Sequence, residues 1–165
     1  MTIYYKKQLE IGSIYQDAIM YQLYKQGIII SCFCSKYAQL NIGESINGYE
    51  IKYSKSFNEM NSIWIETHER QNINQPYTQS GLLRKDNTRK YITGDTQSFI
   101  ILNKKIVQSV INKKIETGNI RENKHSTSKG FTLSMTDKYY NLCLEDAFTV
   151  DNETKNLFFN NEYFK

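Results

Sequence analysis

Proline and glycine are scarce in this sequence of 165 residues, which contains one proline and eight glycines. Such a composition argues against a low-complexity or disordered chain. No apolar run approaches the roughly 20 residues that a membrane-spanning helix needs, and the first residues do not resemble a secretion signal. We therefore expect a cytoplasmic protein without a membrane partner, and the length suits a single domain over residues 1–165.

Cysteine is also rare, and its odd count of three does not fit a disulfide framework. Cys32 and Cys34 lie within an apolar run, where the alternation of a strand would direct both thiols to one face. Because neither a histidine nor another cysteine is near them in the sequence, a zinc site would lack ligands. We interpret the two cysteines as small buried side chains in a reducing compartment.

Aromatic and basic side chains, by contrast, are abundant. The 13 tyrosines and 8 phenylalanines provide large groups for a hydrophobic core. A formal net charge of +4 permits a polyanionic partner such as DNA. The densest basic cluster comprises Arg84, Lys85, Arg89 and Lys90, which could contact the phosphates of a nucleic acid or simply form a solvated face.

Apolar periodicity predicts a mixed α/β protein in which a single mixed β-sheet is flanked by helices. Helices are expected at residues 12–26, 103–116 and 136–147, and strands at 28–34, 62–67, 89–93, 98–102 and 130–135. The run 28–34 is apolar on both faces, as in a central, fully covered strand. His68 and His125 fall in polar loops and are interpreted as surface residues. The aromatic tail after Asp151 is expected to dock onto the fold.

Asp17 has an unusual position on the first predicted helix. Ile14, Ala18 and Tyr21 recur at helical spacing and form the expected packing stripe, and Asp17 lies on that stripe. A buried carboxylate is costly unless it is paired or binds a cation. The alternative is that Asp17 sits at the edge of the stripe and accepts backbone hydrogen bonds in the first turn.

The stretch 41–54 combines a turn signal with charged residues. Its Asn47-Gly48 pair is typical of a turn between two strands. Residues i and i+2 of a strand share a face, so Glu50 and Lys52 are expected to project together, while the intervening Ile51 and its neighbouring tyrosines form an apolar face. The simplest interpretation is an ion pair on a solvent-exposed face, contributing less than about 1 kcal/mol.

The sequence contains, in this order, an acid on a predicted helix, a predicted buried strand, a second acid and Glu-x-Lys. This order resembles the PD-(D/E)xK nuclease superfamily. This superfamily contains restriction-type endonucleases, phage exonucleases and Holliday-junction resolvases. The similarity covers about residues 12–67, and the stretch Gly-Glu-x-x-x-Gly-x-Glu-Ile-Lys is similar to one in small phage and prophage nucleases. The sequence departs from the superfamily pattern at Gly43, where proline is usual, and at Glu44, where aspartate is usual.

The resemblance implies a restriction-endonuclease-like core of α-β-β-β type and a Mg²⁺- or Mn²⁺-dependent deoxyribonuclease that acts as an endonuclease or resolvase. Glu44, Glu50 and the backbone carbonyl of Ile51 would bind the metal ion, whose preferred ligands are oxygens. Asp17 would hold a second ion or orient a water molecule. Lys52 would position or help deprotonate the attacking water and stabilise the transition state.

Further expectations concern the substrate and the assembly. Glu66, on a following strand, would support the site from outside, and the basic cluster from Arg84 to Lys90 would contact flanking phosphates of DNA. A homodimer is expected by analogy, because cutting two strands usually takes two sites. The competing hypothesis is a non-catalytic nucleic-acid-binding or protein-interaction module on a degenerate nuclease fold.

The geometry of the Asn47-Gly48 turn bears directly on the nuclease hypothesis. A two-residue hairpin turn would place Glu44 and Glu50 on opposite faces, where they could not bind one ion. A three-residue loop, or irregular backbone at Glu44, would let the two carboxylates converge. The nuclease hypothesis therefore predicts that the two-residue turn does not form.

Overall fold

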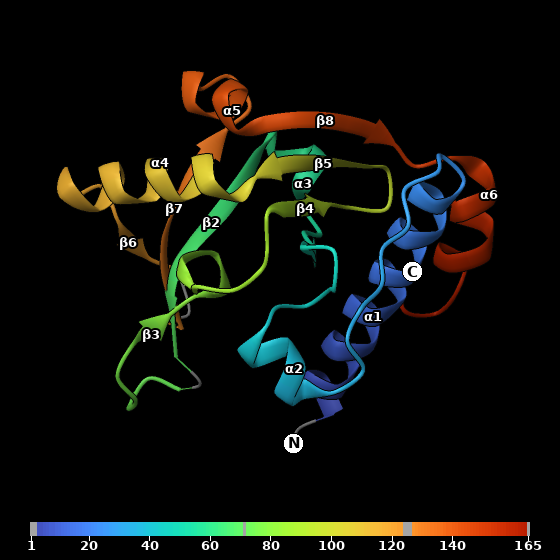
Figure 1. Cartoon of the computed structure of the whole chain (residues 1–165), viewed down its shortest axis with the longest axis horizontal. Helices are drawn as coiled ribbons and strands as arrows, with labels where there is room; N and C mark the ends of the chain where they lie inside the picture. The colour runs from blue at the N-terminus through green and yellow to red at the C-terminus, as the bar shows by residue number, and fades with distance from the viewer. Residues whose placement is uncertain (1–2, 71, 124–126, 165) are drawn as a thin grey trace.

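The computed structural model describes residues 3–70, 72–123 and 127–164, so His125 lies outside the described residues. The helices are α1 (Ile3–Tyr24), α2 (Lys36–Asn41), α3 (Phe57–Met60), α4 (Lys104–Glu116), α5 (Lys138–Cys143) and α6 (Asn152–Thr154), with short turns η1 (Gly81–Leu83) and η2 (Lys155–Phe159). The strands are β1 (Tyr49–Tyr53), β2 (Ser62–Glu69), β3 (Thr78–Gln79), β4 (Lys90–Gly94), β5 (Ser98–Asn103), β6 (Arg121–Glu122), β7 (Ser128–Ser134) and β8 (Leu144–Thr149). They form a mixed α/β protein in which two four-stranded sheets are flanked by helices (Figure 1). In the described part of the chain, no helix has the length and apolar character needed to cross a membrane.

The first sheet is mixed, with the strand order β1-β4-β5-β8. Its edge strand β1 runs parallel to β4, and the remaining pairs are antiparallel. The register sets Glu50 beside Tyr91 and Lys52 beside Thr93. Because paired residues in register direct their side chains to the same side of a sheet, Glu50, Lys52 and Tyr91 share one face.

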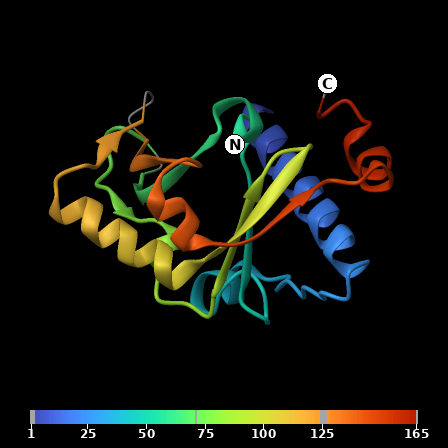
Figure 2. The same cartoon turned by 90° about the horizontal axis from the view of Figure 1, so that it is seen from above.

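The opposite face of the mixed sheet is covered by α1 and by the C-terminal segment (Figure 2). Tyr15, Ile19 and Leu23 recur at helical spacing on α1 and are fully buried in the same core as Ile51 of β1. The expected division of β1 into an apolar and a charged face is therefore confirmed. Phe159 stacks on Tyr15 with ring centres 6.1 Å apart, which confirms that the aromatic tail docks.

The second sheet is antiparallel, with the strand order β3-β2-β7-β6. Ile63 and Ile65 of β2 and Phe131 of β7 belong to a second hydrophobic core, which also contains residues of α4, α5 and the charged side of the mixed sheet. Trp64 and Glu66 alternate with these residues along β2 and are only partly buried. The second sheet therefore packs beside the charged face of β1 instead of extending the mixed sheet.

Two features of the predicted sheet are wrong. The expected single sheet is divided, because the backbone of β2 pairs with the distant β7 and β3 instead of with β1. Residues 28–34 are not a central strand: within this run only Cys32 forms a β-bridge, with Ser45, and Ile29 is 63% exposed. Directly after this run, the Ser35 side chain caps α2 by accepting from the amide of Ala38.

Most other predicted elements are confirmed, with shifted ends. Strands form close to the expected residues 62–67, 89–93, 98–102 and 130–135, and a helix forms close to the expected residues 103–116. The first helix, α1, begins earlier than expected. The helix expected at 136–147 ends at Cys143, and the following residues pair with β5 as β8. Local periodicity does not reveal such a pairing, because it depends on the open edge that β5 presents. The expected burial of the two thiols is wrong for Cys34, which is exposed, while Cys32 is half-buried.

Candidate functional site

An irregular turn before β1 positions Glu44. Ser45 closes this turn, because its hydroxyl donates to the carbonyl of Tyr49 at 2.8 Å or accepts from the amide of Tyr49 at 2.6 Å. Gly48 adopts a φ of 77°, a conformation that favours glycine, and its amide donates to the carbonyl of Ser45. The two-residue hairpin therefore does not form, as the nuclease hypothesis predicted, and Glu44 lies in irregular backbone.

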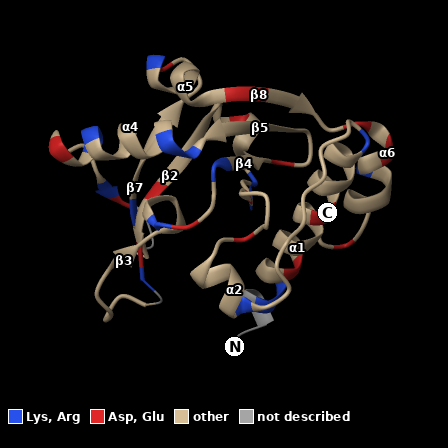
Figure 3. Cartoon of the chain, viewed as in Figure 1, with Lys and Arg blue, Asp and Glu red and all other residues tan. Residues whose placement is uncertain are grey.

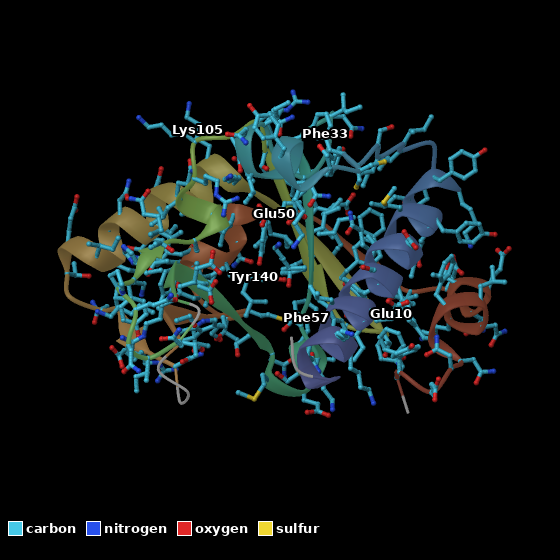
Figure 4. All side chains as sticks on the ribbon, turned by 90° about the horizontal axis from the view of Figure 1, so that it is seen from below. Glu10, Phe33, Glu50, Phe57, Lys105 and Tyr140 are labelled. Atoms are coloured by element: carbon cyan, nitrogen blue, oxygen red, sulfur yellow. The ribbon has the colours of Figure 1, made fainter. Side chains whose placement is uncertain are left out.

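Glu44 and Glu50 converge on the ammonium group of Lys52. Lys52 Nζ lies 2.6 Å from Oε1 of Glu44 and 3.3 Å from Oε1 of Glu50. Glu50 is 5% exposed and lies near the middle of the molecule, whereas the Lys52 side chain is 47% exposed (Figure 4). The cluster therefore has a buried end and an open end, and it confirms that Glu50 and Lys52 project from one face of β1.

This cluster lines a cleft of about 400 Å³ whose other walls come from α2, from β2, from Tyr91 of β4 and from residues 80–86. The charged walls comprise five carboxylates (Glu44, Glu50, Glu66, Glu69 and Asp86) and three cations (Lys36, Lys52 and Arg84). Because carboxylates outnumber cations there, the cleft favours a positively charged ligand or an anion that enters together with a cation.

The electrostatics of the cluster leave Glu50 incompletely compensated. Burial raises the pKa of the Glu50 carboxyl, Lys52 opposes this effect, and repulsion from Glu44 adds to it. Burial acts to lower the pKa of Lys52, but attraction to Glu50 and Glu44 outweighs it, so the pKa of Lys52 is raised. Burial also raises the pKa of Glu66. Lys52 thus stays an ammonium at neutral pH, and its charge does not cancel the cost of burying Glu50.

The backbone of β1 provides another oxygen at this site. The amide of Ser54 and the carbonyl of Gly48 form hydrogen bonds on the β4 side, and backbone groups alternate along a strand, so the carbonyl of Ile51 faces the open edge. Ile51 and Glu44 line a second hollow of about 230 Å³. Among residues 3–70, 72–123 and 127–164, no three His, Cys, Asp or Glu side chains form a compact metal-binding group. A metal site here would combine Glu44, Glu50 and backbone oxygen.

The structure does not bring Asp17 to this cluster. Asp17 is exposed on α1, and the buried stripe runs through Tyr15 and Ile19, so the stripe expected through Ile14 and Tyr21 is wrong. Tyr21 is only partly buried, and its hydroxyl forms a hydrogen bond at the surface by donating to a carboxylate of the C-terminal segment at 2.6 Å. Asp17 is therefore exposed, and it is not among the residues that line the cleft containing Glu44.

The basic residues predicted to contact phosphates are dispersed. Arg84 lines the cleft, whereas Lys85 is simply exposed. Arg89 donates to the turn before β1, and Lys90 forms an ion pair with Glu145. Along the described ribbon, the positions of lysines and arginines are spread over both halves of the molecule (Figure 3). Of the predicted cluster, Arg84 alone faces the candidate site.

A buried ion pair beside the cleft was not expected from the sequence. Asp86 Oδ1 lies 2.6 Å from Lys104 Nζ, and both side chains are at most 5% exposed. Asp86 also accepts from the amide of Thr88 at 2.9 Å. Asp86 stands within the basic cluster of the sequence, but its partner is 18 residues away on α4, so no local pattern joins the two.

Comparisons of this chain with known protein families, with curated proteins and with solved structures find no match. No relative therefore supplies a fold name, a substrate or a reaction for this chain. The residues that line the cleft are the basis for its function.

Proposed function

We propose that this protein is a metal-dependent nuclease that hydrolyses the phosphodiester bonds of DNA. The observation that carries the proposal is the convergence of Glu44 and Glu50 on Lys52 at the wall of one cleft. Paired carboxylates offer oxygen ligands to a divalent cation, and an adjacent ammonium can stabilise a phosphate. The succession of α1, a Glu-x-Lys strand and a mixed sheet supports a restriction-endonuclease-like core, which is part of the proposal.

Glu44, Glu50 and the carbonyl of Ile51 would hold Mg²⁺ or Mn²⁺, with Glu66 in support. These hard oxygen donors suit both ions. The raised pKa of Glu50 supports the fit, because a cation beside its carboxylate would stabilise the buried charge. When bound, the ion neutralises charge on the phosphate and activates water.

Lys52 acts in this proposal as a positive charge and not as a base. Its raised pKa keeps the ammonium protonated, so it donates hydrogen bonds to phosphate oxygens and stabilises the charge that develops in the transition state. Arg84 and Lys36, the other cations of the cleft, contact flanking phosphates. Cutting both strands takes two such sites, so the proposal includes a homodimer.

Incubation of the purified protein with linear, supercoiled and branched DNA tests the proposal. We expect cleavage in Mg²⁺ or Mn²⁺ and none in EDTA. If none of these substrates is cleaved in either metal, the proposed nuclease function is wrong. The alternative would then be a non-catalytic nucleic-acid-binding or protein-interaction module, an assignment favoured by one observation: Lys52 contacts both carboxylates, so the three side chains can serve as a structural ion-pair cluster.

The rate of cleavage should fall on acidification at a higher pH than an ordinary glutamate would give. The reaction needs ionised Glu50, whose raised pKa makes it take up a proton above the usual range of this side chain. Because a bound cation favours the ionised form, the fall should move to lower pH as the Mg²⁺ concentration rises. Profiles of rate against pH at limiting and saturating Mg²⁺ measure the shift. Two profiles that superimpose would contradict this expectation.

Replacing Gly81 with alanine should slow cleavage without unfolding the protein. A Cβ at Gly81 would lie 3.0 Å from Oε1 of Glu50, so the carboxylate would have to move. Because small misplacements of reacting groups are costly, we expect a decrease in rate of about tenfold. Initial rates and thermal unfolding measure the two effects. Gly12→Ala is the matched control, since a Cβ there meets nothing within 4 Å, and equal rates for both variants would remove Gly81 from the site.

A further inference from the structure

Trp64, the single tryptophan of the chain, lies on the wall of the cleft and not in a hydrophobic core. It projects from the same face of β2 as Glu66 and is half-buried, whereas its neighbours Ile63 and Ile65 are fully enclosed in the core. A large aromatic side chain on the polar face of a strand, in the same cleft as Glu50, is placed to contact a ligand.

A glycine of β7 and an arginine of β6 lie next to the ring of Trp64. A Cβ at Gly130 would lie 3.0 Å from Cζ2 of Trp64, so the glycine lets the indole lie close against β7. The guanidinium carbon of Arg121 is 5.7 Å from the centre of the ring, and this side chain is held by a hydrogen bond to Thr132 at 2.8 Å. The enclosed indole N–H has no acceptor within the described residues, which is unusual for a buried polar group.

We infer that Trp64 and Arg121 form a stacking site for an unpaired nucleobase. The inference rests on the proposed nuclease function and names its substrate class: DNA that is single-stranded, or that has an unpaired nucleotide beside the scissile bond. In a duplex the faces of the bases are covered by their neighbours, so an aromatic ring can stack only on a base that has left the stack. A cleft of about 400 Å³ falls within the usual size of small-ligand sites and matches a nucleotide better than a duplex.

The positions of the residues that line the cleft agree with this substrate. Trp64 and Glu66 stand on β2, while Glu50 and Lys52 stand on β1, so a base on the β2 wall leaves its phosphate directed toward the acidic cluster. Lys36 and Arg84 also line the cleft and can neutralise the phosphates on either side. Any base can stack on an aromatic ring, so this site would distinguish unpaired from paired DNA without recognising a particular sequence.

Fluorescence of the single tryptophan reports directly on this site. The protein is titrated with a short single-stranded oligonucleotide and with the corresponding blunt duplex, in EDTA and in Ca²⁺, and anisotropy of labelled DNA is followed in parallel. We expect the single strand to quench Trp64 and to bind at least about tenfold more tightly than the duplex. Trp64→Ala should weaken single-strand binding about tenfold or more, and Trp64→Phe should retain most of the affinity.

Two further variants separate stacking from folding. Arg121 is exposed, so Arg121→Gln should leave thermal unfolding unchanged and weaken single-strand binding severalfold. Tyr24→Ala removes an aromatic side chain that is 63% exposed at the end of α1, and it should bind both DNAs like the unaltered protein. Equal affinity for single strand and duplex, or folded Trp64→Ala and Arg121→Gln variants that bind the single strand normally, would overturn the inference.

The binding experiment and the cleavage experiment fail independently. Quenching by single-stranded DNA without cleavage in any metal would support the stacking site and contradict the proposed nuclease function. Cleavage of duplex and single strand at equal rates, unaffected by Trp64→Ala and Arg121→Gln, would support the proposed nuclease function and contradict the stacking site.

Discussion

Replacing Glu50 with glutamine is expected to slow DNA cleavage by about a thousandfold, within the range of roughly 10²–10⁴ for groups that act on the transition state. Glutamine keeps the shape of the side chain but removes the charge that would hold the metal ion. Glu50 is the buried end of the cluster, so no neighbouring water can easily replace its carboxylate. The measurement is the single-turnover rate of cleavage in saturating Mg²⁺.

The fold of the Glu50→Gln variant should be intact. Because burial raises the pKa of this carboxyl, the folded protein disfavours its charged form, and a neutral amide does not add to that cost. Glu59→Gln is the matched control, since Glu59 is exposed on α3, and its rate should equal that of the unaltered protein. A folded Glu50→Gln variant that cleaves DNA at the normal rate would exclude this cluster from the reaction.

Replacing Lys104 with methionine is expected to lower the free energy of unfolding by about 3–5 kcal/mol, the usual cost of removing one partner from a buried ion pair. Methionine fills much the same volume, but it leaves the carboxylate of Asp86 buried without its 2.6 Å partner. Denaturant unfolding of the variant and of the unaltered protein at neutral pH measures the difference.

Lys105→Met is the matched control for this stability prediction. Lys105 neighbours Lys104 on α4 but is exposed, so its replacement should change the free energy of unfolding by no more than about 0.5 kcal/mol. The double variant Asp86→Asn with Lys104→Met should recover much of the loss, because the unpaired charge is gone while the amide oxygen can still accept from Thr88. Equal unfolding curves for the two lysine variants would show that the ion pair does not stabilise the fold.

Local sequence patterns predicted the elements whose cause is local. Alternation with a period of two placed Glu50 and Lys52 on one face of β1, and an apolar run with strand composition predicted β2. The helix that begins after Asn103 was also expected, and the Asn103 side chain caps it by accepting from the amide of Ile106. Each of these features depends on residues within a few positions of one another.

Local patterns failed where two competing faces had similar character. On α1, stripes through Tyr21 and through Tyr15 both contain aromatic residues at helical spacing, and only packing against β1 and the C-terminal segment decides which stripe is buried. The apolar run 28–34 likewise has the composition of a central strand, yet a strand becomes central only when partners form on both sides. The expected burial of Asp17 depended on a stripe through Ile14 and Tyr21, which is not the stripe that packs against the sheet.

The sequence by itself determined that β1 has one charged and one apolar face, and that the turn before it contains glycine where φ is positive. Only the tertiary structure decided that Glu44 meets Glu50, because the side chain of Asn87 holds the turn by donating to the carbonyl of Ser45 at 2.8 Å. It also decided that β2 pairs with β7 and forms the opposite wall of the cleft. Such contacts join residues far apart in the chain, and their free energy depends on the whole assembled core, which no local propensity encodes.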